Sequence, residues 1–327
     1  MNILVTGGAG FIGSHIARHH LHKGDRVWVI DNLASGNEEN LSPHPNLRFD
    51  QADIRVFEEL QKAIEWSDRI YHMAATIGQR LVLAHTIETL SNNIDGLEVI
   101  LKGMCKTKKE TRLMVASTSG VYIHGADTSD GLLHETALLA VPSGEYLQET
   151  YRLSKMVNEV MTLAYVHQKK LPCTIVRIFN TIGIHQTGRY GMVVPTFVGQ
   201  ALRGKPITVF GNGQQRRAFC NVHDSVEAFD RLLQTPKSIG SIVNVGNHLE
   251  SSILDLAKMI KARTKSSSEI VFVPYKEAYG VDFVDVQSRK PALDVLFKMT
   301  GFRPKWSLEE TLDEVIDFER KKLTSES

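Results

Sequence analysis

The sequence has few cysteines and no spacing that would bring them together. Among its 327 residues only Cys105, Cys173 and Cys220 are cysteines, an odd number of widely separated positions. This pattern excludes a disulfide framework and a cysteine-based metal centre, and no other metal-ligand spacing is present. We therefore expect no metal, a reducing cytoplasmic location, and cysteines that act as small packing residues.

An excess of charge and a long hydrophobic run are also missing. Lys and Arg total 38 and Asp and Glu total 37, for a formal net charge of +1. That balance does not favour nucleic acid or an anionic membrane as a partner. No apolar stretch is long enough to cross a bilayer, and the start, "MNILVTGGAGFIG", lacks the basic and apolar regions of a signal peptide.

Short apolar runs alternate with amphipathic stretches in the first half of the chain. The strand-like runs are 2–7, 26–32, 47–54, 69–75, 112–119 and 173–180, and helical patterns include 11–24, 56–66, 90–107 and 151–168. Alternation of this kind predicts an α/β fold, a doubly wound parallel sheet with helices on both faces.

The regular alternation of strand-like and helical patterns ends after residue 180. A loop-rich segment precedes a helical pattern at 194–204, a strand at 207–211, a strand at 240–246, and helices at 252–264 and 308–322. No repeat or linker separates the parts. We predict a nucleotide-binding domain at 1–180, to which the strand at 240–246 returns, and a smaller, interwoven α/β substrate lobe at 181–327.

The segment "TGGAGFIG" places Gly7, Gly10 and Gly13 between the first strand and the first helix. Glycines allow a tight turn, close approach of the backbone to a pyrophosphate, and close helix packing, while the helix N-terminus attracts the anion. Asp31 ends the second strand, 18 residues after Gly13, where its carboxylate can accept hydrogen bonds from ribose hydroxyls and would repel a 2′-phosphate. The pattern favours NAD over NADP; the alternative is a glycine turn with an unrelated Asp.

Two further segments extend this cofactor prediction. Asp53 ends the third strand and could bind the adenine amino group, although a helix cap explains it nearly as well, and the small residues of "HMAA" allow close passage of a ligand. The predicted cofactor-binding set is Gly7, Gly10, Phe11, Ile12, Gly13, Asp31, Asn32, Asp53, Ile54, Ala74, Ala75, Tyr151 and Lys155.

Tyr151 and Lys155 lie four residues apart at the start of a helical pattern, and therefore on one face of the helix. A nearby ammonium should lower the pKa of the phenol from its usual value of about 10, so that the phenolate can take a proton from a sugar hydroxyl. Thr118 ends the strand at 112–119, at the sheet edge where ligands bind, and its hydroxyl could hold the same oxygen.

With these motifs in place, the sequence resembles the extended short-chain dehydrogenase/reductase family, specifically its NAD-dependent nucleotide-sugar epimerases, dehydratases and decarboxylases. Further carriers of the resemblance are "NNIDG", "STSGVY", "YRLSK", "RIFNTIG", "GRYGMVVPTF" and "FGNGQQRRAF". The resemblance implies a Rossmann-type fold, NAD as cofactor, and Thr118, Tyr151 and Lys155 as catalytic residues. It also implies a substrate-binding set of Asn93, Thr118, Asn180, Val194, Arg217 and Arg289, with the arginines on the phosphates.

The sequence departs from the family pattern on the substrate side. Ile184-His185 replaces the usual Pro-Arg, Ala292 replaces an acid, and the stretch "PSGEYLQET" is atypical. We expect His185 to be a solvated loop histidine rather than a ligand contact.

The residues after Thr118 bear on the choice of reaction. The resemblance implies that NAD+ first oxidises C4 of the sugar to a ketone. Related dehydratases carry Asp-Glu directly after the threonine, and related decarboxylases carry Glu at the position of Gly120, whereas this chain has Ser119 and Gly120. A 4-epimerase needs no such acid, so we predict a 4-epimerase acting on a UDP-linked hexose, N-acetylhexosamine or hexuronate.

Two alternatives remain at this point. One is a nucleotide-sugar dehydratase or UDP-glucuronate decarboxylase that takes its acid from Glu145 or Glu149. The other is a non-catalytic NAD-binding sensor. Whichever reaction applies, the helical patterns at 90–107 and 151–168 resemble the pair of helices that forms the family's dimer interface. This resemblance predicts a homodimer.

Overall fold

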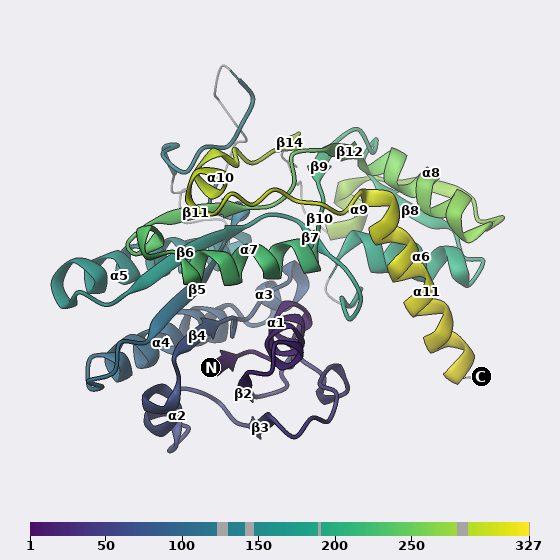
Figure 1. Ribbon diagram of the computed structural model, residues 1–327. Helices are drawn as coiled ribbons and strands as arrows, with labels where there is room; N and C mark the ends of the chain where they lie inside the picture. The colour runs from purple at the N-terminus through teal and green to yellow at the C-terminus, as the bar shows by residue number, and fades with distance from the viewer. Residues whose placement is uncertain (123–129, 141–146, 189–190, 280–286, 327) are drawn as a thin grey trace.

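The computed structural model describes residues 1–122, 130–140, 147–188, 191–279 and 287–326. Its centre is a parallel sheet of seven strands in the order β11-β6-β5-β4-β1-β2-β3 (Figure 1). The strands are β1 (Asn2–Thr6), β2 (Arg26–Asp31), β3 (Leu47–Gln51), β4 (Arg69–His72), β5 (Arg112–Thr118), β6 (Cys173–Ile178) and β11 (Ile242–Val245). This order reverses direction between β1 and β4, as in a Rossmann-type sheet, and confirms the predicted fold class.

Alternate side chains of β1 fix which helices cover which face of the sheet. Ile3 and Val5 pack in one apolar cluster with Phe229 of α7 (Val222–Gln234), and this face also holds α1 (Phe11–His22) and α10 (Asp294–Thr300). Leu4 packs in a second cluster with Leu97 of α4 (Thr86–Met104), beside α2 (Leu60–Trp66). The predicted helix at 56–66 begins only at Leu60, because Asp53 caps a turn by accepting from the Arg55 N–H at 2.9 Å.

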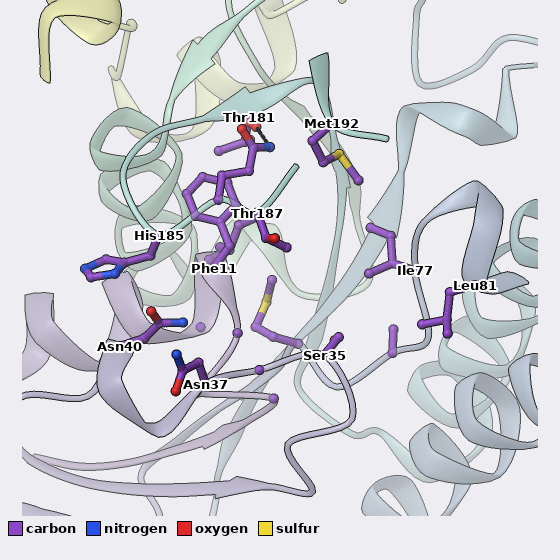
Figure 2. A pocket seen from close by; sticks show the side chains of 18 of the residues that line it. Phe11, Ser35, Asn37, Asn40, Ile77, Leu81, Thr181, His185, Thr187 and Met192 are labelled. Carbon is purple, nitrogen blue, oxygen red and sulfur yellow. Dashed lines mark hydrogen bonds between the residues drawn. The ribbon is translucent and has the colours of Figure 1, made fainter. Parts of the chain in front are cut away.

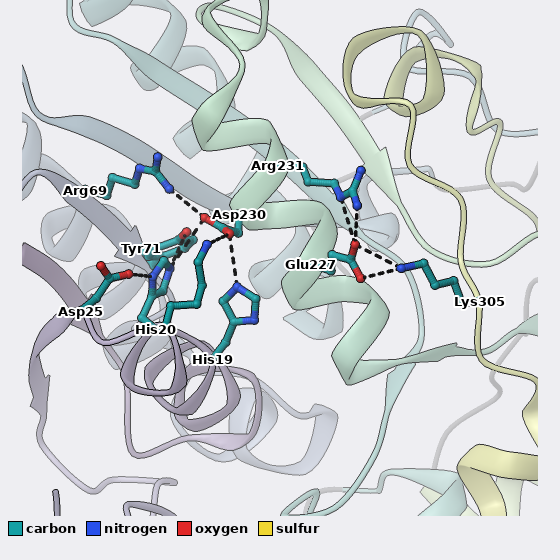
Figure 3. A network of polar contacts seen from close by, with 10 residues as sticks. His19, His20, Asp25, Arg69, Tyr71, Glu227, Asp230, Arg231 and Lys305 are labelled. Carbon is teal, nitrogen blue, oxygen red and sulfur yellow. Dashed lines mark hydrogen bonds and ion pairs between the residues drawn. The ribbon is translucent and has the colours of Figure 1, made fainter. Parts of the chain in front are cut away.

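Asp230 of α7 fixes this helix to the first half of the chain (Figure 3). Its carboxylate accepts from Lys23 Nζ at 2.6 Å, Arg69 Nη1 at 2.7 Å and His19 Nε2 at 3.2 Å. Although burial opposes ionisation, these partners hold the pKa of Asp230 well below its usual range. The chain after residue 181 therefore returns to the first half through α7, β11 and α10.

The second part of the molecule is made of small sheets and three longer helices. The strand pairs are β7 (Thr181–Ile182) with β10 (Cys220–Asn221), and β8 (Ile207–Phe210) with β13 (Ile270–Val273); β9 (Arg216–Ala218) lies between β12 (Glu250–Ser252) and β14 (Ser288–Arg289). The helices α6 (Val193–Leu202), α8 (Ile253–Thr264) and α11 (Leu308–Glu326) share one apolar core.

The remaining elements are short connections, apart from α5 (Thr150–Lys169), which packs beside α4. They are η1 (Glu38–Asn40), α3 (Gln79–Ala84), η2 (Ser119–Val121), η3 (Leu147–Glu149), η4 (Pro236–Ser238) and α9 (Tyr275–Tyr279). None of the helices in the described part of the chain is both long and apolar enough to span a membrane.

Candidate functional site

A cavity of about 1520 Å³ opens at the carboxyl ends of the parallel strands, between the two parts of the molecule (Figure 2). Every residue of the predicted cofactor-binding set lines it. Of the predicted catalytic and substrate-binding residues, those that line it are Thr118, Tyr151, Lys155, Asn180 and Arg289.

The glycine segment forms the floor of the nucleotide side. Gly7 has a φ of 70°, and a Cβ there would lie 2.6 Å from the backbone nitrogen of Ala74. A Cβ on Gly13 would overlap the carbonyl oxygen of Gly7. Gly10 caps α1 without a side-chain hydrogen bond, so N–H groups of the first turn remain available to an anion. These features fit the pyrophosphate of a dinucleotide.

Asp31 lies at the end of β2 and is held by the backbone. Its Oδ1 accepts from Leu33 N at 2.8 Å and its Oδ2 from Ala9 N at 3.0 Å, while burial raises the pKa of the carboxyl. A carboxylate has about four acceptor positions, so capacity for hydroxyl donors remains. The geometry fits the predicted role on a ribose.

Asp53 lines the cavity, but its carboxylate is paired with a residue that the sequence did not indicate. Arg55 Nε lies 3.0 Å from Asp53 Oδ1 and 3.1 Å from Oδ2, and this hydrogen bonding lowers the pKa of Asp53. Arg55 also donates to Ser91 Oγ at 3.0 Å and itself lines the cavity. The adenine contact of Asp53 therefore stays a prediction.

The three predicted catalytic side chains meet where β5 ends and α5 begins. Tyr151 lies near Thr118, whose hydroxyl favours the lower pKa of the phenol and whose Oγ1 accepts from Gly120 N at 3.1 Å. Lys155 Nζ donates to the carbonyl oxygen of Ala116 at 2.9 Å and lies 5.9 Å from the centroid of the Tyr151 ring. One hydroxyl pair and one buried amine thus face the same part of the cavity.

The sequence predicts that Lys155 lowers the pKa of the Tyr151 phenol. In the protein without bound ligands this prediction is wrong. Burial raises the pKa of Tyr151 to about 12, opposed only by the Thr118 hydroxyl, and burial lowers the pKa of Lys155 to about 8. Desolvation disfavours both charged forms. Because Lys155 points at the Ala116 carbonyl, its charge does not offset the desolvation of the phenol.

On the substrate side, Asn180 and Arg289 line the cavity. The Nδ2 of Asn180 is buried and has no hydrogen-bond partner among the described residues, so an unsatisfied donor belongs to a residue of the cavity wall. Arg217 of β9 pairs in register with Arg289 of β14, and both side chains are largely buried, but Arg217 does not itself line the cavity.

The substrate contacts predicted for Asn93 and Val194 are corrected by the structure, because neither side chain lines the cavity. Asn93 is fully buried; its Oδ1 accepts from Thr76 N at 2.8 Å and its Nδ2 donates to Ser154 Oγ at 2.9 Å. Val194 points into the core of the second part, together with Phe197. Both residues support the walls of the site from behind.

His185 is also corrected, since it is not a solvated loop residue. Its ring packs edge-on against Phe318 of α11 with centroids 4.8 Å apart, and Arg18 donates to its Nε2 at 3.1 Å. Burial lowers the pKa of His185 to about 4. His185 and Phe318 both line the cavity, and nothing in the sequence indicated that α11 would reach it.

Of the two acids considered as alternative catalysts, the structure describes only Glu149, which is engaged elsewhere. Glu149 forms an ion pair with Arg152, and Glu145 lies outside the described residues. The carboxylates of described residues that line the cavity are Asp31, Glu39, Asp53 and Glu319. None of these comes from β5, η2 or α5, the elements that carry Thr118 and Tyr151.

Comparison with known proteins agrees with this geometry. Residues 3–246 match the NAD dependent epimerase/dehydratase family. The chain is 35% identical to the UDP-N-acetyl-alpha-D-glucosaminuronate decarboxylase of Bacillus cytotoxicus over 97% of both chains. It is 36% identical to UDP-glucuronic acid decarboxylase 1 of Xenopus tropicalis, covering 98% of this chain and 72% of that protein.

Solved structures of epimerases have the same fold. The UDP-glucose 4-epimerase of Thermotoga maritima superposes with a TM-score of 0.87 and 29% identity, covering 99% of this chain and 100% of the other. The UDP-glucuronic acid 4-epimerase of Bacillus cereus gives 0.86 and 27%, covering 98% and 100%. The predicted family and cofactor are therefore confirmed: this chain is an enzyme of the NAD-dependent epimerase/dehydratase family.

Proposed function

We propose that the protein is a nucleotide-sugar 4-epimerase that acts on a UDP-linked hexose, N-acetylhexosamine or hexuronate through a transient 4-keto sugar. Support comes from Thr118 and Tyr151, which line the cavity together with the buried amine of Lys155. NAD, which the glycine segment and Asp31 would hold, would supply the hydride acceptor and donor for C4.

Each side chain has a distinct task in this proposal. Thr118 and Tyr151 hold the C4 hydroxyl, and Tyr151 takes its proton as the hydride leaves. The charge of Lys155 alone does not offset the desolvation of Tyr151, so Lys155 would bind the ribose hydroxyls of NAD, and the positive charge of oxidised NAD would favour the phenolate. Asn180 Nδ2 and Arg289 bind the diphosphate of the substrate as hydrogen-bond donor and cation.

The observation that carries the choice of epimerisation is the pair Ser119-Gly120, which offers no carboxylate next to Thr118. No acid that lines the cavity in the described part of the chain comes from the strand or helix of the catalytic pair. Epimerisation needs none, because the keto sugar has only to turn over and receive hydride on its other face.

A decarboxylase is the second candidate, and the names of the curated relatives favour it. A dehydratase is the weaker form of the same alternative. With a UDP-hexuronate, oxidation at C4 would give a keto acid that can lose CO2 before hydride returns. The same first step would therefore lead to a pentose product.

Incubation with UDP-glucose, UDP-N-acetylglucosamine and UDP-glucuronate, with the products identified by NMR, tests the proposal. Inversion at C4 without loss of carbon supports it. Release of CO2 from UDP-glucuronate would replace it with the decarboxylase, and uptake of solvent deuterium at C5 with loss of water would indicate the dehydratase. A protein that binds NAD and leaves every sugar unchanged would be the non-catalytic sensor.

We propose in addition that the enzyme is a homodimer built on α4 and α5. These helices pack side by side, and they present apolar side chains to solvent, among them Ile87, which is 81% exposed, and Val160, which is 70% exposed. A mass of two chains in light scattering is expected, and the mass of one chain would refute this proposal.

A further inference from the structure

The loop that follows β7 contains a buried oxygen atom without a hydrogen-bond partner. Gln186 Nε2 donates to the carbonyl oxygen of Thr181 at 3.0 Å, whereas Gln186 Oε1 is shielded from solvent and unpaired. Because a carbonyl can only accept, the bond to Thr181 fixes the orientation of the amide. The unsatisfied atom is therefore an acceptor.

This loop is held at both ends, so the position of Gln186 is well defined. Thr181 of β7 pairs with Cys220 of β10. A Cβ on Gly188 would lie 3.0 Å from Thr196 Oγ1, which places the far end of the loop tightly against α6. A side chain on a braced loop is suited to selecting a ligand group.

Gln186 faces the ligand cavity beside the start of α1. It lines the cavity together with Phe11 and Thr187, which Figure 2 shows close to each other, with the hydrogen bond to Thr181 drawn above them. A Cβ on Gly183 would lie 3.5 Å from the ring of Phe11, so the loop lies directly over this end of the helix.

Two unsatisfied amide atoms of opposite polarity thus belong to residues that line one cavity. Asn180 Nδ2 is a buried donor, and Gln186 Oε1 is a buried acceptor. A phosphate or carboxylate, which only accepts, can satisfy Asn180 but not Gln186. Leaving a buried acceptor unpaired is unfavourable, so the complex is stabilised by a ligand that brings an O–H or N–H to this point.

We propose that Gln186 is a ligand-recognition residue whose Oε1 accepts a hydrogen bond from a neutral donor, a sugar hydroxyl or an amide N–H, of the molecule bound in the cavity. NAD and the nucleotide sugar both carry such donors. The identity of the nucleotide sugar rests on the proposed function, whereas binding of NAD does not.

The test compares Gln186→Met with a second glutamine that lines the same cavity. Gln200 is the matched control because the protein satisfies its amide: Nε2 donates to Thr208 Oγ1 at 2.9 Å and Oε1 accepts from Thr208 N at 3.1 Å. Calorimetric titrations with NAD, UDP and UDP-glucuronate give the dissociation constants. A Tyr151→Phe background prevents turnover during the titrations.

For Gln186→Met we expect the dissociation constant of one ligand to rise about tenfold, with a melting temperature no lower than that of the parent when no ligand is added. For Gln200→Met we expect a lower melting temperature and unchanged dissociation constants. If only NAD binds more weakly, the donor is on the cofactor. If UDP-glucuronate binds more weakly but UDP does not, the donor is on the sugar. If UDP and UDP-glucuronate both bind more weakly, the donor is on the uridine.

Dissociation constants within about twofold of the parent for all three ligands would overturn the proposal and leave Gln186 Oε1 with water as its partner. If the wild-type protein converts no sugar but Gln186→Met binds NAD more weakly, the epimerase proposal is refuted and the proposed role of Gln186 is still supported.

Discussion

The nucleotide side of the cavity is made of strand ends from one sheet, whereas the substrate side is made of a loop, two-residue strands and helices from different parts of the fold. On the nucleotide side the cavity wall is formed mainly by backbone atoms, at Gly7, Gly13 and the start of α1. On the substrate side, side chains such as Asn180 and Arg289 face the ligand. Changes on the first side should affect the cofactor, and changes on the second should affect the choice of substrate and product.

The catalytic pair lies where the two sides meet, and Tyr151→Phe should have the largest effect. Removing only the phenolic hydroxyl should lower kcat by about 10²- to 10⁴-fold, because general acid–base catalysis is lost. NAD affinity should be nearly unchanged in a titration followed by protein fluorescence.

Tyr122→Phe is the matched control for this prediction. The Tyr122 hydroxyl donates to Asn244 Oδ1 at 2.9 Å, buried away from the cavity, so its removal should lower stability and leave kcat near the wild-type value. If both variants lost activity equally, the assignment of Tyr151 as the base would be wrong.

The same glycine-to-alanine change on each side should separate their roles. At Gly13 the new Cβ meets the Gly7 carbonyl oxygen, a rigid backbone atom, so Gly13→Ala should weaken NAD binding about tenfold or more. At Gly199 of α6 the nearest atom is Arg203 Nη1 at 3.0 Å, the end of a flexible side chain. Gly199→Ala should bind NAD with the affinity of the wild type. Equal NAD affinity of the two variants would contradict the difference between the two sides of the cavity.

The substrate side should control the product. Gly120→Glu places a carboxylate two residues after Thr118, and a Cβ there meets only the Thr118 side chain, at 3.3–3.4 Å. With UDP-glucuronate we expect CO2 release to rise about tenfold or more relative to C4 inversion, because an acid–base group is added. Gly120→Gln, which has the same size without the charge, should not do so. Equal product ratios in both variants would remove Gly120 as the determinant.

A smaller effect concerns the pH dependence of stability. Burial lowers the pKa of Lys155 in the folded state to about 8, below the 10.5 of an exposed lysine, so between these values the unfolded chain holds a proton that the folded chain lacks. Stability of the wild type relative to Lys155→Met should therefore rise with pH across this window. Chemical denaturation of the protein without ligands, at pH 7, 8, 9 and 10, measures it; a difference that does not change with pH would contradict the burial of the amine.

The smallest effect on catalysis is expected at Asn93, which supports the cavity wall from behind. Asn93→Ala removes the hydrogen bonds to Thr76 N and Ser154 Oγ and should lower the free energy of unfolding by about 1–3 kcal/mol. KM for the nucleotide sugar should change little in the folded fraction. A large rise in KM at full stability would restore the substrate contact predicted from the sequence.

The residues that sequence reasoning located correctly are those whose role depends on local backbone geometry. Gly7, Gly13 and Asp31 follow directly from a strand, a turn and a helix, and all three line the cavity. The same holds for Thr118 at the end of β5. A parallel sheet brings its carboxyl ends to one edge, so these positions are fixed once the strands are recognised.

The residues that were misplaced depend on contacts between distant segments. Asn93 belongs to α4, but its partners are Thr76 and Ser154, and only the packed fold shows that they satisfy its amide. His185 is half-buried because Phe318 of α11 reaches it across more than a hundred residues of sequence. No predicted helix covers α7, although its apolar face, which packs on the central sheet, follows a helical repeat in the sequence.

The most direct test of the proposed reaction is to follow UDP-glucuronate labelled with carbon-13 at its carboxyl group by NMR in the presence of the wild-type enzyme. The proposal predicts that the label stays in a nucleotide sugar inverted at C4, and that Tyr151→Phe abolishes the conversion. Appearance of the label as CO2 or bicarbonate would contradict epimerisation and establish the decarboxylase in its place.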